Sequence, residues 1–196
     1  IPQTRGNCSS IMILCAGKNE IFDFAKPVGV GLVESAITLT KYVLEAKPSF
    51  LLFVGTAGSY GNYKVFDTAI THHAANIELG YLKNECYTPL NSLASAKKGY
   101  VSRGTNTDFP IINSSNYITT SLSLSKKMLE QNIELENMEF FSIVSLANHF
   151  NVPCSGFFVV TNYCNENAHA DFLKNHAKAK ELITSYIKNF QNTEVL

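Results

Sequence analysis

Small and polar residues directly follow the apolar runs of this sequence, and these are the residues that could do chemistry. Ala16-Gly-Lys-Asn-Glu20, Gly55-Thr-Ala-Gly-Ser59 and Thr161-Asn162 each come after such a run. If the runs are strands of an open α/β sheet, ligands bind beyond their carboxyl ends. Small residues leave room for a ligand there, and the polar residues can bind it. We therefore expect a small-molecule site at these strand ends.

Two further segments could contribute to such a site. Gly29-Val-Gly31 lies at a strand-to-helix turn, where glycines let backbone amides approach an anion or a sugar. It lacks the third glycine of a dinucleotide-binding fingerprint, and a tight turn is the simpler alternative. Met138-Glu139 lies at the start of an apolar helix, where a carboxylate is also favoured by the helix dipole alone. Taken singly, Glu20 would be a surface residue and Asn162 a turn residue.

Other chemistries have little support in the sequence. The histidines are not spaced as metal ligands, and two neighbours on a strand would point to opposite faces; they are His72, His73, His149, His169 and His176. No P-loop and no Ser-His-Asp arrangement can be argued. The five cysteines form no CxxC pair, which is typical of free thiols in a reducing compartment. We expect no metal site.

Composition favours one folded domain. The chain has 196 residues, of which 45% are hydrophobic and only 16% charged, so disorder is not expected. The formal net charge is +0, which disfavours a nucleic-acid or membrane-surface binder. Residues 1–10 are polar and do not resemble a signal peptide, so we expect a flexible lead-in or a cloning remnant there. Residues 11–196 are expected to form the single domain.

The apolar patterns predict alternating strands and helices. Segments 11–15, 50–54 and 156–160 are apolar on both faces, as buried strands are. Further strands are expected at 65–70, 100–102 and 109–112, and a loop at 84–98. Helical spacing of apolar residues predicts helices over 31–47, 122–131, 138–150 and 168–190. A strand, a helix and a second strand imply a parallel crossover, so we expect a mixed sheet with helices on its faces.

Four of these segments, in order along the chain, resemble the purine nucleoside phosphorylase and methylthioadenosine nucleosidase superfamily. Gly29-Val-Gly31 resembles its glycine turn, and Lys47-Pro48 with Leu52–Gly58 resembles its “KPD…GTAG” segment. Asn137-Met-Glu139 with the helix through Pro153 resembles “EMEA…VP”, and Val159–Asn162 falls at its base-contacting strand end. The resemblance spans about 11–187. It implies a three-layer αβα sandwich with a mixed, partly barrel-like central sheet.

The resemblance also implies roles for individual residues. The family cleaves the bond between ribose and base through an oxocarbenium-like transition state, so it must hold the sugar and stabilise the leaving base. Glu139 would accept hydrogen bonds from the ribose hydroxyls, and Met138 would pack beneath the sugar. Asn162 would face N7 of the purine. The other expected substrate contacts are Thr56, Ala57, Gly58, Tyr117, Ile118 and Phe158.

The sequence leaves the attacking group open. Glu20 falls where the family's nucleosidases carry the carboxylate that activates water. Phosphorylases hold phosphate in this loop, often with an arginine, and a second family arginine would fall at Phe53. The candidate phosphate ligands that remain are Gly29, Lys18 and Arg103.

The second departure from the nucleosidases is Asn162, where they place an aspartate that protonates N7. An amide can donate a hydrogen bond but cannot protonate a leaving group. The family's trimeric-type phosphorylases use a Thr-Asn pair at this strand end with 6-oxopurine substrates. We therefore predict a purine nucleoside phosphorylase acting on a 6-oxopurine nucleoside in purine salvage, with phosphate as co-substrate and no cofactor.

Two alternatives remain at this point. One is a nucleosidase that hydrolyses a purine nucleoside such as methylthioadenosine. The other is a catalytically degenerate protein that binds a nucleoside or base without turnover. In each case we expect a small-molecule partner and a cytoplasmic location, with no nucleic acid or membrane as partner. Because family members are dimers, trimers or hexamers, we also expect a homo-oligomer.

Overall fold

A computed structural model describes residues 10–97 and 109–193 of the chain. Three of the expectations above fall outside these residues. They are Arg103, the strand at 100–102, and all but the last residue of the lead-in at 1–10.

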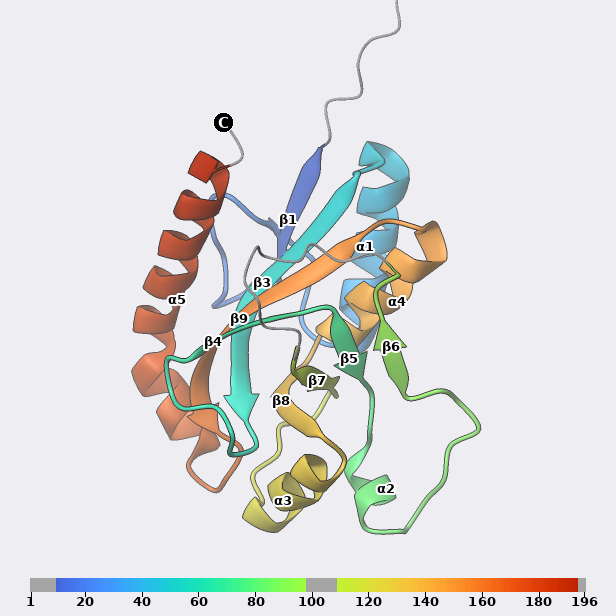
Figure 1. The fold of residues 1–196 in the computed structure, drawn as a ribbon, viewed down its shortest axis with the longest axis vertical. Coiled ribbons are helices and arrows are strands. Elements are labelled where there is room, and N and C mark those ends of the chain that lie inside the picture. Colours follow the sequence, from blue (N-terminus) through green and yellow to red (C-terminus); the bar gives the residue numbers. More distant parts are fainter. Residues whose placement is uncertain (1–9, 98–108, 194–196) are drawn as a thin grey trace, which may run out of the picture.

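The centre of the described structure is a mixed sheet of nine strands, with helices against it (Figure 1). Its strands are β1 (Ile11–Cys15), β2 (Lys26–Pro27), β3 (Phe50–Ser59), β4 (Thr68–Thr71), β5 (His73–Ala75), β6 (Leu93–Ser95), β7 (Ile111–Ser114), β8 (Ile133–Asn137) and β9 (Cys154–Tyr163). The helices are α1 (Leu32–Ala46), α2 (Leu79–Leu82), α3 (Leu122–Glu130), α4 (Phe140–Phe150) and α5 (Ala168–Thr193).

The long strand β3 organises the sheet. One edge of β3 pairs with parallel β1 along its first half and with antiparallel β8 at its end, and the other edge pairs with parallel β9. Both β3 and β9 are buried along nearly their whole length, as expected for strands covered on both faces. Because β1, β3 and β9 run in the same direction, their carboxyl ends meet at one end of the sheet.

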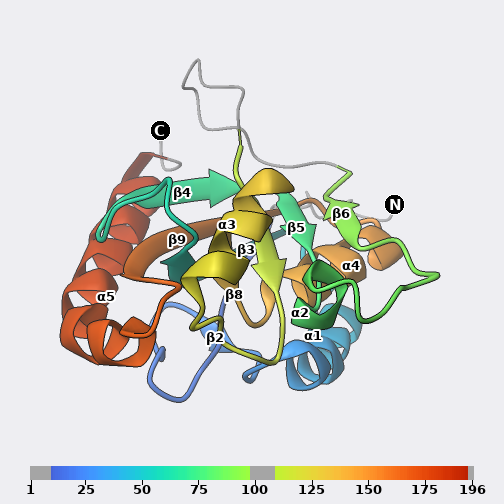
Figure 2. The ribbon, with the colours of Figure 1, turned by 90° about the horizontal axis from the view of Figure 1, so that it is seen from below.

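Helices cover the two faces of the sheet and complete three layers (Figures 1 and 2). On one face, α5 packs Ala179, Ile183 and Ile187 against side chains of β1, β3 and β9. On the other face, buried residues of α1 and α4 form the larger core, which includes Leu39 and Phe140. The predicted sandwich with a mixed sheet is therefore confirmed, although the sheet curls without closing into a barrel.

Several local predictions differ from the structure. Strand β8 was not predicted, and β6 lies within the segment expected to be a loop. His72 and His73 do not diverge across a strand. His72 lies in a bend before β5, and the two ring centroids are 4.1 Å apart. No helix among the described residues is long and apolar enough to cross a membrane.

Candidate active site

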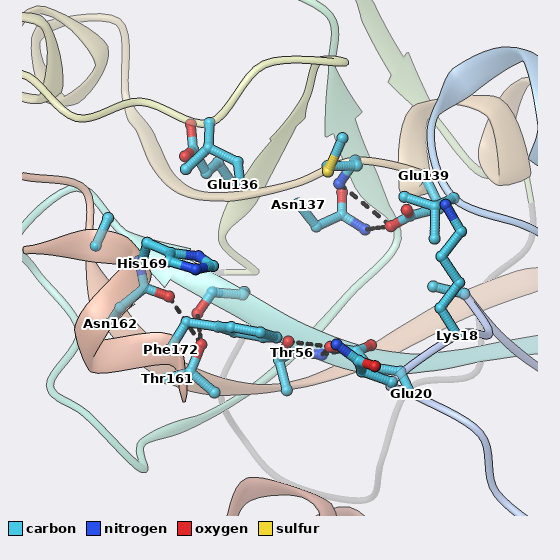
Figure 3. Close-up of a pocket in the computed structure, with 18 of the residues that line it drawn as sticks. Lys18, Glu20, Thr56, Glu136, Asn137, Glu139, Thr161, Asn162, His169 and Phe172 are labelled. Carbon is cyan, nitrogen blue, oxygen red and sulfur yellow. Dashed lines mark hydrogen bonds between the residues drawn. The ribbon is translucent and has the colours of Figure 1, made fainter. Parts of the chain in front are cut away.

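A cavity of about 300 Å³ opens at the shared carboxyl end of β1, β3 and β9 (Figure 3). The loop after β1, the end of β8, the approach to α3 and the first turn of α5 complete its walls. Its lining residues are Ala16, Gly17, Lys18, Asn19, Glu20, Val30, Thr56, Ala57, Gly58, Tyr117, Ile118, Glu136, Asn137, Met138, Glu139, Thr161, Asn162, Ala168, His169 and Phe172.

Glycines in β3 let neighbouring side chains reach into the cavity. A Cβ atom on Gly58 would lie 2.8 Å from the Cys164 sulfur and 3.2 Å from the amide nitrogen of Asn162. A Cβ atom on Gly55 would lie 3.0 Å from a carboxylate oxygen of Glu20. These are close steric contacts. Gly55 and Gly58 are therefore needed because the side chains of Glu20, Cys164 and Asn162 lie directly against β3 at these positions.

Glu20 is fixed against the end of β3. The backbone N–H of Thr56 donates to both carboxylate oxygens of Glu20, at 3.3 Å each, and the Thr56 hydroxyl donates to Oε1. Burial raises the pKa of Glu20 above its ordinary value, although the Thr56 hydrogen bonds and Lys180 act in the opposite direction. Glu20 is thus a largely buried, oriented carboxylate with increased basicity, which is what a general base requires.

Glu139 is the second carboxylate of the cavity, and it lies just before α4. Its Oε1 accepts a hydrogen bond from the Gly31 N–H at 3.0 Å, and its Oε2 accepts from Met138 N and Asn137 Nδ2. Glu139 therefore links α4 to the glycine turn before α1. The pKa of Glu139 is raised to about 7. Burial is the main cause, and the nearby charge of Glu20 raises the pKa further.

Asn162 presents a hydrogen-bond donor to the cavity. Its Nδ2 donates to the Tyr163 carbonyl at 3.1 Å, and its Oδ1 accepts from the Thr161 hydroxyl at 2.8 Å. A backbone carbonyl can only accept, so it fixes which end of the amide carries hydrogen. One N–H of the amide remains for a ligand, and 7% exposure shows that the side chain is almost buried.

Glu136 also lines the cavity, although sequence reasoning missed it. Its carboxylate accepts from Tyr60 Oη at 2.7 Å, from the Thr119 N–H at 2.9 Å and from the Thr119 hydroxyl at 2.7 Å. Burial, and after it the charge of Glu136, raise the pKa of Tyr60 well above its ordinary value. Because three donors already hold it, Glu136 is positioned as a wall of the cavity.

The structure brings most of the residues predicted from the sequence together. Those that line the cavity are Lys18, Glu20, Thr56, Ala57, Gly58, Tyr117, Ile118, Met138, Glu139 and Asn162. Phe158 does not line it: its fully buried ring packs in the core, 5.8 Å from the Phe53 ring centroid and 5.2 Å from that of Phe140. Gly29 also lies outside the lining, and its N–H donates to the Ala16 carbonyl.

Aromatic and imidazole side chains from α5 complete the cavity and were not predicted. Phe172 and His169 line the cavity together with Thr56, Thr161 and Asn162 (Figure 3). Both come from the first turns of a helix whose apolar spacing was evident, but the spacing alone does not show which end of the helix faces a ligand.

Charge in the cavity is predominantly negative. Three carboxylates line it, while Lys18 is the one lysine or arginine among its described lining residues. Lys18 is exposed and lies in the loop after β1. In the described part of the chain, no three His, Cys, Asp or Glu side chains gather as metal ligands do.

Comparisons with known proteins identify the family and the fold. The family model described as the phosphorylase superfamily matches residues 9–192. Among curated proteins, no sequence matches the chain.

Solved structures of similar fold include three hydrolases. The 5′-methylthioadenosine/S-adenosylhomocysteine nucleosidase of Helicobacter pylori has a TM-score of 0.77 at 16% identity, covering 94% of this chain and 98% of that one. Futalosine hydrolase of the same organism has a TM-score of 0.76 at 16% identity, with the same coverages. The Streptococcus pneumoniae MTA/SAH nucleosidase has a TM-score of 0.72 at 13% identity, covering 91% and 96%. At these identities the likeness shows the fold.

Proposed function

The chain belongs to the phosphorylase superfamily, and we propose that it cleaves the N-glycosidic bond of a purine nucleoside with water rather than with phosphate. One observation carries this proposal: the carboxylate of Glu20 accepts the hydrogen bonds that the backbone N–H and the hydroxyl of Thr56 donate, near the end of β3. A backbone N–H and a hydroxyl at a strand end are the groups that would otherwise bind an anion. Here they hold an internal carboxylate within the cavity.

Electrostatics argue in the same direction. A phosphate dianion in the cavity would be repelled by the ionised carboxylate of Glu20 and, as the pH rises through about 7, also by that of Glu139. Repulsion between charges is strong where water is excluded. Lys18 is the feature that favours phosphorolysis, but its exposed charge is screened by solvent. A neutral water molecule carries no such cost, so hydrolysis fits the site better than the phosphorylase reaction predicted from the sequence.

The three polar groups of the cavity have complementary tasks in this reaction. Glu20 takes a proton from the attacking water as its oxygen bonds to C1′ of the sugar, and the bond from C1′ to the base breaks. Glu139 accepts hydrogen bonds from the sugar hydroxyls and favours positive charge on the ribose. The electron pair of the broken bond goes to the base, which Asn162 stabilises with its free N–H.

The amide of Asn162 guides the choice of base. Since it cannot give up a proton, the base must be one that leaves with hydrogen bonding alone. We propose a 6-oxopurine nucleoside as the substrate, because such bases leave more readily as anions than adenine does. The printed names of the solved structures above give methylthioadenosine, S-adenosylhomocysteine and futalosine as the compounds on which those proteins act. Homo-oligomerisation and a cytoplasmic location stay predictions.

Base release with and without phosphate tests the proposal. Inosine, guanosine, adenosine and methylthioadenosine would each be assayed with wild-type protein, the Glu20→Gln variant, and Glu181→Gln as a control on the exposed side of α5. We expect release from inosine or guanosine that is indifferent to phosphate, yields free ribose, and is lost in Glu20→Gln only. Release that requires phosphate and yields ribose 1-phosphate would overturn the proposal.

A further inference from the structure

A histidine on α5 lies behind Glu20 with its inner nitrogen unused. His176 Nε2 is 3.8 Å from Glu20 Oε1, and the two side chains are only 14% and 13% exposed. Within the described residues, Nε2 is buried and has no hydrogen-bond partner. Leaving a buried polar atom unpaired costs free energy, so such an atom calls for an explanation in the function of the site.

The position of His176 along α5 fits a role at the cavity. Phe172 lies one turn earlier and lines the cavity, and its ring centroid is 4.7 Å from that of His176. Lys180 lies one turn later and acts on Glu20 electrostatically. Residues spaced by four share one face of a helix. One face of α5 therefore presents an aromatic wall, an imidazole and a cation toward the loop that carries Glu20.

We propose that His176 is a positioning residue for Glu20, donating the hydrogen on its Nε2 to Oε1 once substrate fills the cavity. The inference rests on the proposed function, in which Glu20 is the base. At 3.8 Å the contact is longer than a hydrogen bond, and hydrogen bonds at active sites commonly tighten only when substrate is bound. Thr56 and His176 would then hold the carboxylate from two sides.

The charges around the pair suit a neutral donor. Burial and the positive charge of Lys180 lower the pKa of His176, which keeps the imidazole uncharged at neutral pH. A neutral imidazole with hydrogen on Nε2 donates to a carboxylate without taking its proton. The other ionisable groups that act near Glu20 are Glu139 and Cys15. Loss of the donor would leave Glu20 dependent on Thr56 and Lys180 for stabilisation of its ionised form.

Carbon-13 NMR of the Glu20 carboxyl group tests the proposal without requiring turnover. The protein would be labelled at glutamate, the resonance assigned with Glu20→Gln, and the titration followed with hypoxanthine bound in the cavity, in wild type, His176→Phe, His176→Gln and the control His149→Gln on α4. Phe keeps a ring against Phe172 but donates no hydrogen, whereas the amide of Gln can replace Nε2. We expect the Glu20 midpoint to rise by about one pH unit in His176→Phe, as expected for one hydrogen bond to a charged group. It should stay near the wild-type value in His176→Gln and His149→Gln.

Two outcomes would overturn the inference. One is an unchanged or lowered Glu20 midpoint in His176→Phe. The other requires no variant. It is a nitrogen-15 spectrum of the wild-type protein with hypoxanthine bound, if that spectrum places the His176 hydrogen on Nδ1. In the kinetic assay, the acid limb of kcat, which reports the substrate complex, should move with the NMR midpoint, a change that a purely structural role would not produce. If no nucleoside is hydrolysed and the midpoint still moves, the proposed function fails while the pairing of His176 with Glu20 holds.

Discussion

The buried carboxyl group of Glu139 should make stability depend on pH in a direction opposite to that of most acidic residues. Its pKa is raised from 4.5 to about 7, mainly by burial. Between these values the native state holds the proton and the unfolded chain does not. The contribution of Glu139 to stability is therefore complete below about pH 4.5 and is lost as the pH rises through about 7.

The magnitude follows from the two pKa values. Integrating proton binding from about pH 5 to about pH 8 gives a loss of about 2.5 kcal/mol in the free energy of unfolding. Glu139→Gln removes this loss because the amide does not titrate. In the variant, the amide oxygen would take the place of Oε2, which accepts hydrogen bonds from Met138 and Asn137. The amide nitrogen would then face the Gly31 N–H, and two donors would oppose each other. That cost of about 1 kcal/mol is independent of pH, so it cancels when the two pH values are compared.

Urea denaturation of both proteins at the two pH values measures the effect. We expect the stability of Glu139→Gln relative to wild type to improve by about 2.5 kcal/mol from about pH 5 to about pH 8. Glu45→Gln, on the exposed side of α1, is the matched control and should follow the wild type. Parallel pH profiles for wild type and Glu139→Gln would show that burial does not disfavour the ionised carboxylate, and the argument would fail.

Three other changes test different parts of the structure. Thr56→Val removes the hydroxyl that donates to Glu20, so kcat/KM should fall about tenfold and its acid limb should move to higher pH; initial rates across pH measure both. Asn162→Asp supplies a group that can protonate the leaving base and should raise the rate on adenosine; an unchanged or reduced rate would count against its assignment. Gly156→Ala would place a Cβ atom 2.4 Å from the Phe158 ring, so the free energy of unfolding should fall by about 1–3 kcal/mol in urea titrations.

The three central strands could be predicted from the sequence because strong local signals mark them. Apolar runs with small residues after them located β1, β3 and β9, and parallel pairing brings their carboxyl ends together. Two predicted ends were wrong, because β3 continues to Ser59 and β9 to Tyr163. Glu20, Thr56 and Asn162 follow from that rule. Glu139 follows from its place before an apolar helix.

Other residues of the site depend on contacts that local sequence does not show. Phe158 was expected at the cavity, but β9 is buried on both faces, and an apolar strand gives no sign of which face meets a ligand. The alternation of Ile133-Glu-Leu-Glu-Asn137 is a strand signal that could have identified β8. Even so, the alternation does not show that Thr119 and Tyr60, from other segments, hold the carboxylate of Glu136 at the cavity.

The cost of burying Glu139 is linked to what the site can do. In the free protein, its ionised form is disfavoured by burial and by the charge of Glu20, since both carboxylates share one cavity. In the proposed reaction, positive charge grows on the sugar bound in this cavity. The same low-dielectric surroundings that make the carboxylates unfavourable without a ligand strengthen their attraction to that charge. An interaction of this kind is stronger in the transition state than with the neutral substrate, so it lowers the barrier and not only the dissociation constant. A phosphate ion in the same cavity would meet the opposite field, which is the physical basis of the proposal that water is the attacking group.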